Sequence, residues 1–221
     1  MKALRRTAAG LLRLTGLYHA ARDWRRDRDF RSHSRERVLR WQREGRPSPP
    51  PDAVKYACIR RYAEQFATPV LVETGTFHGN AIFTLRNAFR EIHSIELAPA
   101  LHARAVLDLG HLTHIHLHLG DSAAELPKVA RTLGAPALFW LDGHFCSGPS
   151  ARGEKDTPVF EELTYLLGRP PGRDVVLIDD ARLFNGRDGY PTVEALRELV
   201  ASSRPQASFG VEEDIIRILP V

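Results

Sequence analysis

Acidic side chains end or follow five short apolar runs, and they are the residues best placed to do chemistry. They are Glu73, Glu96, Asp121, Asp142 and the pair Asp179 and Asp180. One acid in such a place is unremarkable, because acids also cap the helix that follows a strand. In an open parallel sheet, however, ligands bind beyond the carboxyl ends of the strands. Five successive acidic ends therefore predict a binding site lined by carboxylates.

Two glycines follow the first of these acids. Gly75 and Gly79 would let the main chain pass close to a ligand, where a Cβ atom would collide. A dinucleotide site would instead carry G-x-G-x-x-G, which holds the pyrophosphate on the start of a helix. That pattern is broken here by Thr76, Phe77 and His78. The glycines alone fit an ordinary strand-to-helix turn, so the acids around them carry the prediction.

The acid that ends the second run suits a sugar. Glu96 stands 21 residues after Gly75, near the spacing at which an acid grips the ribose in nucleotide sites. Glu73 would repel a phosphate group. A site rich in acids and poor in Lys and Arg instead suits a ligand that joins adenosine to an amino group and a sulfonium.

Three other carboxylates are expected to converge. If the fourth and fifth strands are neighbours, their ends lie about 4.8 Å apart, which brings Asp142 close to Asp179 and Asp180. Mg²⁺ prefers such oxygen ligands. It would chelate two oxygens of a vicinal diol and lower the pKa of one. Alternatively, the pair Asp179 and Asp180 caps a helix, lies in a solvated turn or pairs with Arg182 or Arg187.

Several histidines lie near these positions. His144, two residues after Asp142, is a suitable general base, because its unperturbed pKa is about 6.5. It fits an ordinary loop histidine equally well. His114, His116 and His118 alternate, so they share one face of a strand. That spacing suits a metal ion, but the polar face of an edge strand is the interpretation we favour.

The elements that hold these residues alternate regularly from residue 52 onward. Apolar runs predict strands over 69–73, 91–96, 114–119, 136–141 and 174–178, and helical stretches separate them, the first of which covers 80–89. Such alternation predicts a doubly wound α/β fold with helices on both faces. The end of the chain, 207–211 and 215–219, predicts an antiparallel hairpin. The fold class is therefore α/β, with a mostly parallel seven-stranded sheet.

The ordered set of motifs resembles class I S-adenosylmethionine-dependent O-methyltransferases. It comprises Val72–Gly79, Ser94–Glu96, Gly120–Ser122, Trp140–His144 and Leu177–Asp180. Within that group the chain is most similar to the macrocin O-methyltransferase-like branch, which is metal-dependent and modifies sugars. The resemblance covers roughly residues 52–221. Phe77 departs from it, because the family motif E/D-x-G-x-G-x-G has its middle glycine at this position.

The resemblance implies a role for each site residue. Glu73 and Gly75 would face the methionine part of the cofactor, Glu96 the ribose, and Asp121 with Ser122 the adenine. Thr76 and Gly79 complete the cofactor-binding set. Asp142, Asp179 and Asp180 would hold a divalent cation such as Mg²⁺. Catalysis would rest on Asp142 and on His144, where the family usually has an acid.

The expected function is methyl transfer from S-adenosylmethionine to a hydroxyl of a sugar or polyol, in a small-molecule or glycan acceptor. A first alternative keeps the fold and cofactor but does other chemistry, such as hydroxylation. A second is a non-catalytic nucleotide-binding scaffold with a basic docking arm. Neither a scaffold nor a capping role needs three converging carboxylates.

The N-terminal part of the chain differs in charge from the rest. Residues 1–51 carry fourteen basic and five acidic side chains, whereas residues 52–221 carry seventeen and twenty-two. A run of prolines near residues 47–51 stops any helix, so we expect a basic helical arm over 1–51 and a catalytic domain over 52–221. The arm suits a peripheral membrane or partner contact, or packing on the body or a dimer mate, and shows no nucleic-acid motif.

The cysteine content and the apolar stretch near the N-terminus indicate in which compartment we expect the protein. The 221 residues include two cysteines, Cys58 and Cys146, too few for a disulfide framework. The apolar stretch near the N-terminus is interrupted by Arg13 and is too short to span a bilayer. We therefore expect a cytoplasmic protein, which is able to form a homo-oligomer.

Overall fold

A computed structural model describes residues 16–143, 157–170 and 172–221. The chain divides into two compact units, residues 1–46 and residues 47–221. His144, the predicted base, and Cys146 lie outside the described residues. Among the helices of the described ranges, none combines the length and apolar character that a membrane crossing needs.

The described part of the first unit is one helix, α2 (Leu17–Arg43). It follows Gly16, whose positive φ of 73° starts the turn into the helix. Its surface is held by pairs between neighbouring turns, such as Arg40 with Glu36 at 3.2 Å. Such exposed pairs contribute only about 0.3–0.5 kcal/mol each. The basic segment is thus a continuous helix over this range.

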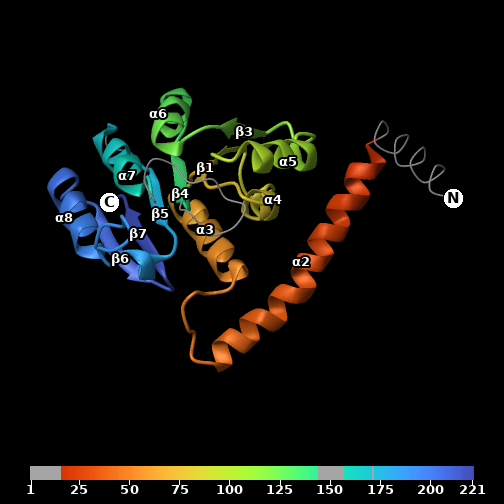
Figure 1. Ribbon diagram of the computed structural model, residues 1–221, viewed down its shortest axis with the longest axis horizontal. Coiled ribbons are helices and arrows are strands. Elements are labelled where there is room, and N and C mark those ends of the chain that lie inside the picture. The colour runs from red at the N-terminus through yellow and green to blue at the C-terminus, as the bar shows by residue number, and fades with distance from the viewer. Residues whose placement is uncertain (1–15, 144–156, 171) are drawn as a thin grey trace. The chain divides into compact units, whose positions relative to one another are not determined.

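The second unit is built on a seven-stranded sheet with the order β3-β2-β1-β4-β5-β7-β6 (Figure 1). The first five strands are parallel, β7 runs antiparallel to β5, and β6 pairs antiparallel with β7. The predicted sheet with its C-terminal hairpin is confirmed. The strands are β1 (Val70–Thr74), β2 (Glu91–Glu96), β3 (Ile115–Leu119), β4 (Ala137–Leu141), β5 (Val175–Ile178), β6 (Ser208–Glu212) and β7 (Ile215–Leu219).

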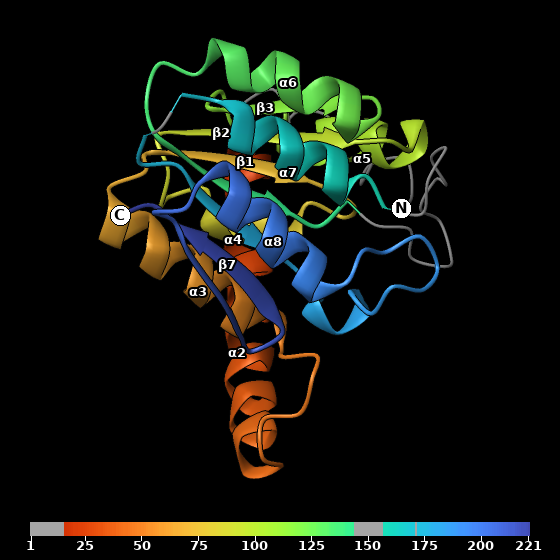
Figure 2. The ribbon, with the colours of Figure 1, turned by 90° about the vertical axis from the view of Figure 1, so that its left-hand side faces the viewer.

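Helices cover both faces of the sheet. Figure 2 shows three of them side by side on one face, α6 (Ser122–Thr132), α7 (Val159–Gly168) and α8 (Val193–Ser203). The other face carries α3 (Asp52–Phe66), α4 (Asn80–Leu85) and α5 (Pro99–Leu109). A short 3₁₀ turn, Ala181–Leu183, follows β5. Every residue of β1, β4 and β5 is buried, as expected for strands packed on both sides.

The predicted elements match the observed ones to within a few residues, except at α4. The sequence predicts a helix over 80–89, whereas α4 ends at Leu85. The Arg86 guanidinium donates a hydrogen bond of 2.6 Å to the Phe83 carbonyl. The Arg86 side chain thus bonds to a carbonyl of the last helical turn, and the residues that follow turn toward β2.

Candidate cofactor and acceptor site

The loop after β1 needs glycine at two positions. Gly75 has φ +87°, and a Cβ atom there would collide with the main-chain carbonyl of Asp142. Gly79 has φ +63°, and a Cβ atom would lie 2.8 Å from the Leu109 side chain. Gly75 thus allows the β1 and β4 loops to touch at the carboxyl edge of the sheet.

Phe77 takes the backbone conformation that a glycine would adopt. Its φ is +47°, in the left-handed region that a bulky side chain rarely enters. Its N–H donates a hydrogen bond of 2.7 Å to Glu96 Oε2. The loop therefore keeps a left-handed turn although the middle glycine of the family motif is replaced, and Glu96 holds that turn.

Glu96 is buried and fixed by the main chain. Its second oxygen, Oε1, accepts a hydrogen bond of 2.8 Å from the Ala98 N–H. Each carboxylate oxygen has two lone pairs, so each retains one for a ligand. The side chain is thus oriented at the end of β2, as a ribose-binding carboxylate needs to be.

Glu73 lies beneath the same loop in a chain of hydroxyl groups. Ser94 Oγ donates to Glu73 Oε2 at 2.5 Å, and Thr76 Oγ1 lies 2.6 Å from Ser94 Oγ. Burial raises the pKa of Glu73 to about 8, and the nearby Glu96 charge acts in the same direction. Without a cationic ligand, Glu73 is therefore largely protonated at neutral pH.

The residues that the sequence predicts at the adenine, Asp121 and Ser122, lie at the start of α6. Asp121 caps this helix, because its Oδ1 accepts a hydrogen bond of 2.9 Å from the Ala123 N–H. Ser122 is buried next to it. Its hydroxyl would lie 3.3 Å from a Cβ atom at Gly143, so it stands against the β4 loop. Asp121 thus caps α6 through Oδ1, whereas Oδ2 takes no part in the cap.

A buried acid that sequence reasoning missed lies under this edge. Glu162 of α7 is 1% exposed and stands beside the hydroxyl groups of Ser122 and Thr74. Burial raises its pKa to about 7. Its position was visible in the sequence, because Glu162 falls in the apolar stripe formed by Val159, Leu163 and Leu166.

The structure brings Asp142, Asp179 and Asp180 together. Leu141 and Ile178 are paired across β4 and β5, so Asp142 and Asp179 follow adjacent positions. One oxygen from each of the three carboxylates lies within 4.8 Å of the others. The convergence expected from adjacent strand ends therefore exists in the fold.

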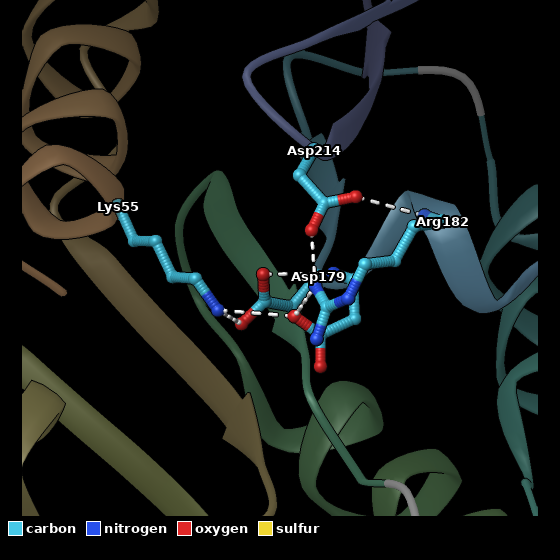
Figure 3. A network of polar contacts seen from close by, with 5 residues as sticks. Lys55, Asp179, Arg182 and Asp214 are labelled. Carbon is cyan, nitrogen blue, oxygen red and sulfur yellow. Dashed lines mark hydrogen bonds and ion pairs between the residues drawn. The ribbon is translucent and has the colours of Figure 1, made fainter. Parts of the chain in front are cut away.

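A lysine pairs with two acids of this cluster, and Figure 3 shows its side chain pointing toward Asp179. Lys55 Nζ of α3 lies 2.6 Å from Asp179 Oδ2 and 3.1 Å from Asp180 Oδ1. Arg182 also pairs with Asp180, at 2.8 Å, and reaches Asp214. Of the two arginines considered as partners, Arg182 takes that role, whereas Arg187 is exposed. Sequence reasoning missed Lys55 because 124 positions separate it from Asp179 and no local pattern links them.

The surroundings of this cluster shift the pKa values of Asp179 and of Lys55. Burial raises the pKa of Asp179 to about 6, Lys55 opposes that shift, and Asp180 adds to it. Burial alone would lower the pKa of Lys55, but its ion pairs with Asp179 and Asp180 raise it above its ordinary value. Lys55 is therefore an ammonium at neutral pH, and it serves as a fixed cation and not as a base.

The helix that carries Lys55 also places a phenol at the site. Tyr56 is buried, and burial raises its pKa above the ordinary value. The charges of Asp52, Glu73 and Asp142 act in the same direction. Tyr56 therefore remains a neutral hydroxyl that can donate a hydrogen bond beside these acids.

Comparison with known proteins agrees with this architecture. The O-methyltransferase TomG from Streptomyces achromogenes, solved in complex with S-adenosylmethionine, is 17% identical, with a TM-score of 0.55 over 84% of this chain and 88% of its own. An O-methyltransferase from Bacillus cereus, in complex with S-adenosylhomocysteine, is 14% identical, with a TM-score of 0.54 over 83% and 89% of the two chains. The chain has the class I methyltransferase fold.

A third solved structure with this fold is similar to the same extent. The methyltransferase PaMTH1 of Podospora anserina, bound to S-adenosylhomocysteine, is 17% identical, with a TM-score of 0.52 over 76% of this chain and 78% of its own. No protein-family model and no curated protein sequence matches the chain. At these identities the class I methyltransferase likeness establishes the architecture, and function must be argued from the site.

Proposed function

We propose that this protein is an S-adenosylmethionine-dependent O-methyltransferase. The observation that carries the proposal is the pair of buried carboxyl groups, Glu73 and Glu96, beside a glycine loop at the carboxyl edge of the sheet. The Glu96 carboxylate would repel a phosphate-bearing ligand there. A ligand that carries an ammonium, a sulfonium and a ribose would be attracted, because carboxylates attract its two cationic groups and accept hydrogen bonds from its ribose hydroxyls.

The roles divide along the edge of the sheet. Glu96 retains one lone pair on each oxygen for the two ribose hydroxyls. Glu73 lies one strand away, since its partner across the strands is Ser94, and suits the cationic methionine part. Ser122 and Asp121 suit the adenine, with Thr76 and Gly79 shaping the loop. Solved proteins of the same fold are complexes with this cofactor or its demethylated product.

Comparing two variants by calorimetry with S-adenosylmethionine tests this assignment. Glu96→Ala removes a charged acceptor of two hydroxyls and should weaken binding by about 10- to 100-fold. Ser122→Ala removes one neutral hydrogen bond and should weaken binding by about tenfold at most. Glu96→Gln serves as a second variant that keeps one acceptor. Equal affinities for all forms, each shown to be folded, would disprove the ribose role of Glu96.

The neighbouring acids are proposed to serve the acceptor. The three carboxylates form the oxygen donor set that a hard divalent cation prefers, and they lie close enough to share one ion. Bound there, Mg²⁺ or Mn²⁺ would lower the pKa of an acceptor hydroxyl. A vicinal diol of a sugar or polyol is the acceptor that fits this chemistry. His144, two residues beyond Asp142, is the proposed base.

Lys55 supports a metal-free version of the same reaction. Its ammonium already offsets the charges of Asp179 and Asp180 at 2.6 and 3.1 Å. A divalent cation must therefore compete with it for these oxygens. If Lys55 is itself the working cation, it would attract a developing alkoxide without metal.

Calorimetry with Mn²⁺ separates the two versions. With a metal site, the wild-type chain binds one ion, Asp179→Asn abolishes binding, and Lys55→Met strengthens it by about tenfold or more because the competing charge is gone. The exposed Arg187→Met is the matched control and should change nothing. Binding seen only in Lys55→Met would show that the lysine replaces the metal, and the metal-dependent version would be discarded.

A further inference from the structure

A cluster of histidines lies on β2 and the edge strand β3. Glu91 and His93 lie two residues apart on β2, and His116 and His118 lie two residues apart on β3. The register pairs His93 with His116, so these side chains share one face of the sheet. It is the face that α6 covers, since Ile95 on the same side of β2 packs in the core with Leu126 of α6.

The cluster is separate from the cofactor site in position and in direction. Glu91 is the first residue of β2, at the opposite end of the strand from Glu96. Ser94 and Glu96 alternate with His93 and Ile95 along β2, so they point to the other face of the sheet. Glu73 pairs with Ser94 and points to that face too. The methyltransferase proposal therefore leaves these histidines without a role.

The atoms of the cluster are spaced as ligands of one ion. Glu91 Oε1 lies 3.0 Å from His93 Nε2 and 3.7 Å from His116 Nε2. One ligand atom from each of the three residues falls within 4.8 Å of the others. Two atoms bound to a tetrahedral ion at about 2.0–2.1 Å lie about 3.3–3.4 Å apart. Small side-chain adjustments would therefore complete the first three positions.

We propose that Glu91, His93 and His116 bind one Zn²⁺ ion that joins β3 to β2. Two imidazoles and one carboxylate suit zinc, with water in the fourth position. That position is open, because the side chain of His116 is 46% exposed whereas that of His93 is 8% exposed. Among the strands of the described residues, β3 pairs with β2 alone, so an ion here fixes the edge of the sheet.

A fourth side chain orients the central ligand. His93 Nδ1 lies 3.1 Å from His118 Nε2. With Nε2 on the ion, Nδ1–H of His93 donates to that nitrogen, which is the outer contact that metal-bound histidines usually make. Burial lowers the pKa of His93 and of His118, which favours the neutral rings that metal binding requires.

The test is a calorimetric titration with Zn²⁺ of the full chain, without a polyhistidine tag and stripped with EDTA. We expect one ion bound with micromolar affinity or better. Zn²⁺ at roughly a hundredfold excess over Kd should raise Tm by about 5–10 °C. His116→Ala, at an exposed position, should weaken binding by about a hundredfold, and Glu91→Gln by about tenfold or more.

Two controls locate the ion. His114→Gln keeps a donor for the Arg86 carbonyl, which His114 contacts at 2.9 Å, and should bind zinc like the wild type. Asp179→Asn removes a carboxylate of the other candidate cluster and should still bind the ion that His116→Ala loses. The proposal is overturned if wild-type protein binds no zinc, if His116→Ala binds it unchanged, or if Asp179→Asn alone loses it.

Discussion

At the scale of single residues, the burial of Glu73 makes cofactor binding depend on the loss of a proton from its carboxyl group. Its pKa is raised to about 8, whereas the proposed ligand is cationic and needs the ionised carboxylate. The acid itself is readable from the sequence, because it ends a buried strand before a glycine. Its hydroxyl chain is not, because Ser94 comes from β2 and meets Glu73 only through the sheet register.

The first prediction concerns the pH dependence of S-adenosylmethionine binding. Affinity should rise with pH up to about 8, by at most about tenfold per pH unit, because the proton on Glu73 must leave before the cation binds. Glu73→Gln should bind more weakly, and it should show only the titration of the ligand's own amino group. Calorimetry between about pH 6 and pH 9 measures both. Parallel curves for the two proteins would contradict the prediction.

At the scale of elements, apolar runs and their spacing predicted the strands and most helix limits, because burial on both faces leaves little choice of residue. The sequence did not predict which helix residues reach the site. Lys55 of α3 and Glu162 of α7 arrive there through packing of helices on opposite faces of the sheet. Glu162 stands in an apolar stripe, so a sequence reading could have found it, whereas Lys55 required the fold.

The second prediction concerns the stability contributed by α7. The pKa of Glu162 in the folded state is about 7, raised by burial from 4.5. Below about pH 4.5 the Glu162 carboxyl is protonated in both the folded and the unfolded state. As the pH rises from there toward 7, the unfolded state loses this proton first, so the free energy of unfolding falls. Glu162→Gln lacks this titration and should be more stable above pH 7, on the order of 3 kcal/mol.

Urea denaturation at a pH below 5 and at pH 8 checks this prediction. The difference between Glu162→Gln and the wild type should be small at the lower pH and large at the higher one. Glu161→Gln is the matched control, because its side chain lies one position outside the buried stripe. An equal difference at both pH values would show that Glu162 does not titrate as the fold implies.

At the scale of the whole molecule, charge is divided between the two parts of the chain. The first 51 residues hold fourteen basic side chains against five acidic ones. The proposed site lies wholly within residues 47–221, which form a compact unit. The basic arm is proposed to contact an anionic surface or a partner.

The third prediction is that residues 47–221 suffice for folding and cofactor binding. A protein beginning at Pro47 should unfold cooperatively and bind S-adenosylmethionine with an affinity within about threefold of the full chain, because every residue of the proposed cofactor site belongs to the compact second unit. Circular dichroism and calorimetry measure the two properties. Insolubility or lost binding would place the arm within the core or within an obligate dimer.

The most direct test of the central claim is a calorimetric titration of the full chain with S-adenosylmethionine, alongside ATP and NAD⁺. We expect one binding site with a Kd in the micromolar range or below. We expect no comparable binding of the two phosphate-bearing ligands, because the Glu96 carboxylate repels phosphate and the described residues of the cofactor site offer no cation to hold it. A folded protein that shows no heat with millimolar S-adenosylmethionine, or that prefers ATP or NAD⁺, would contradict the account.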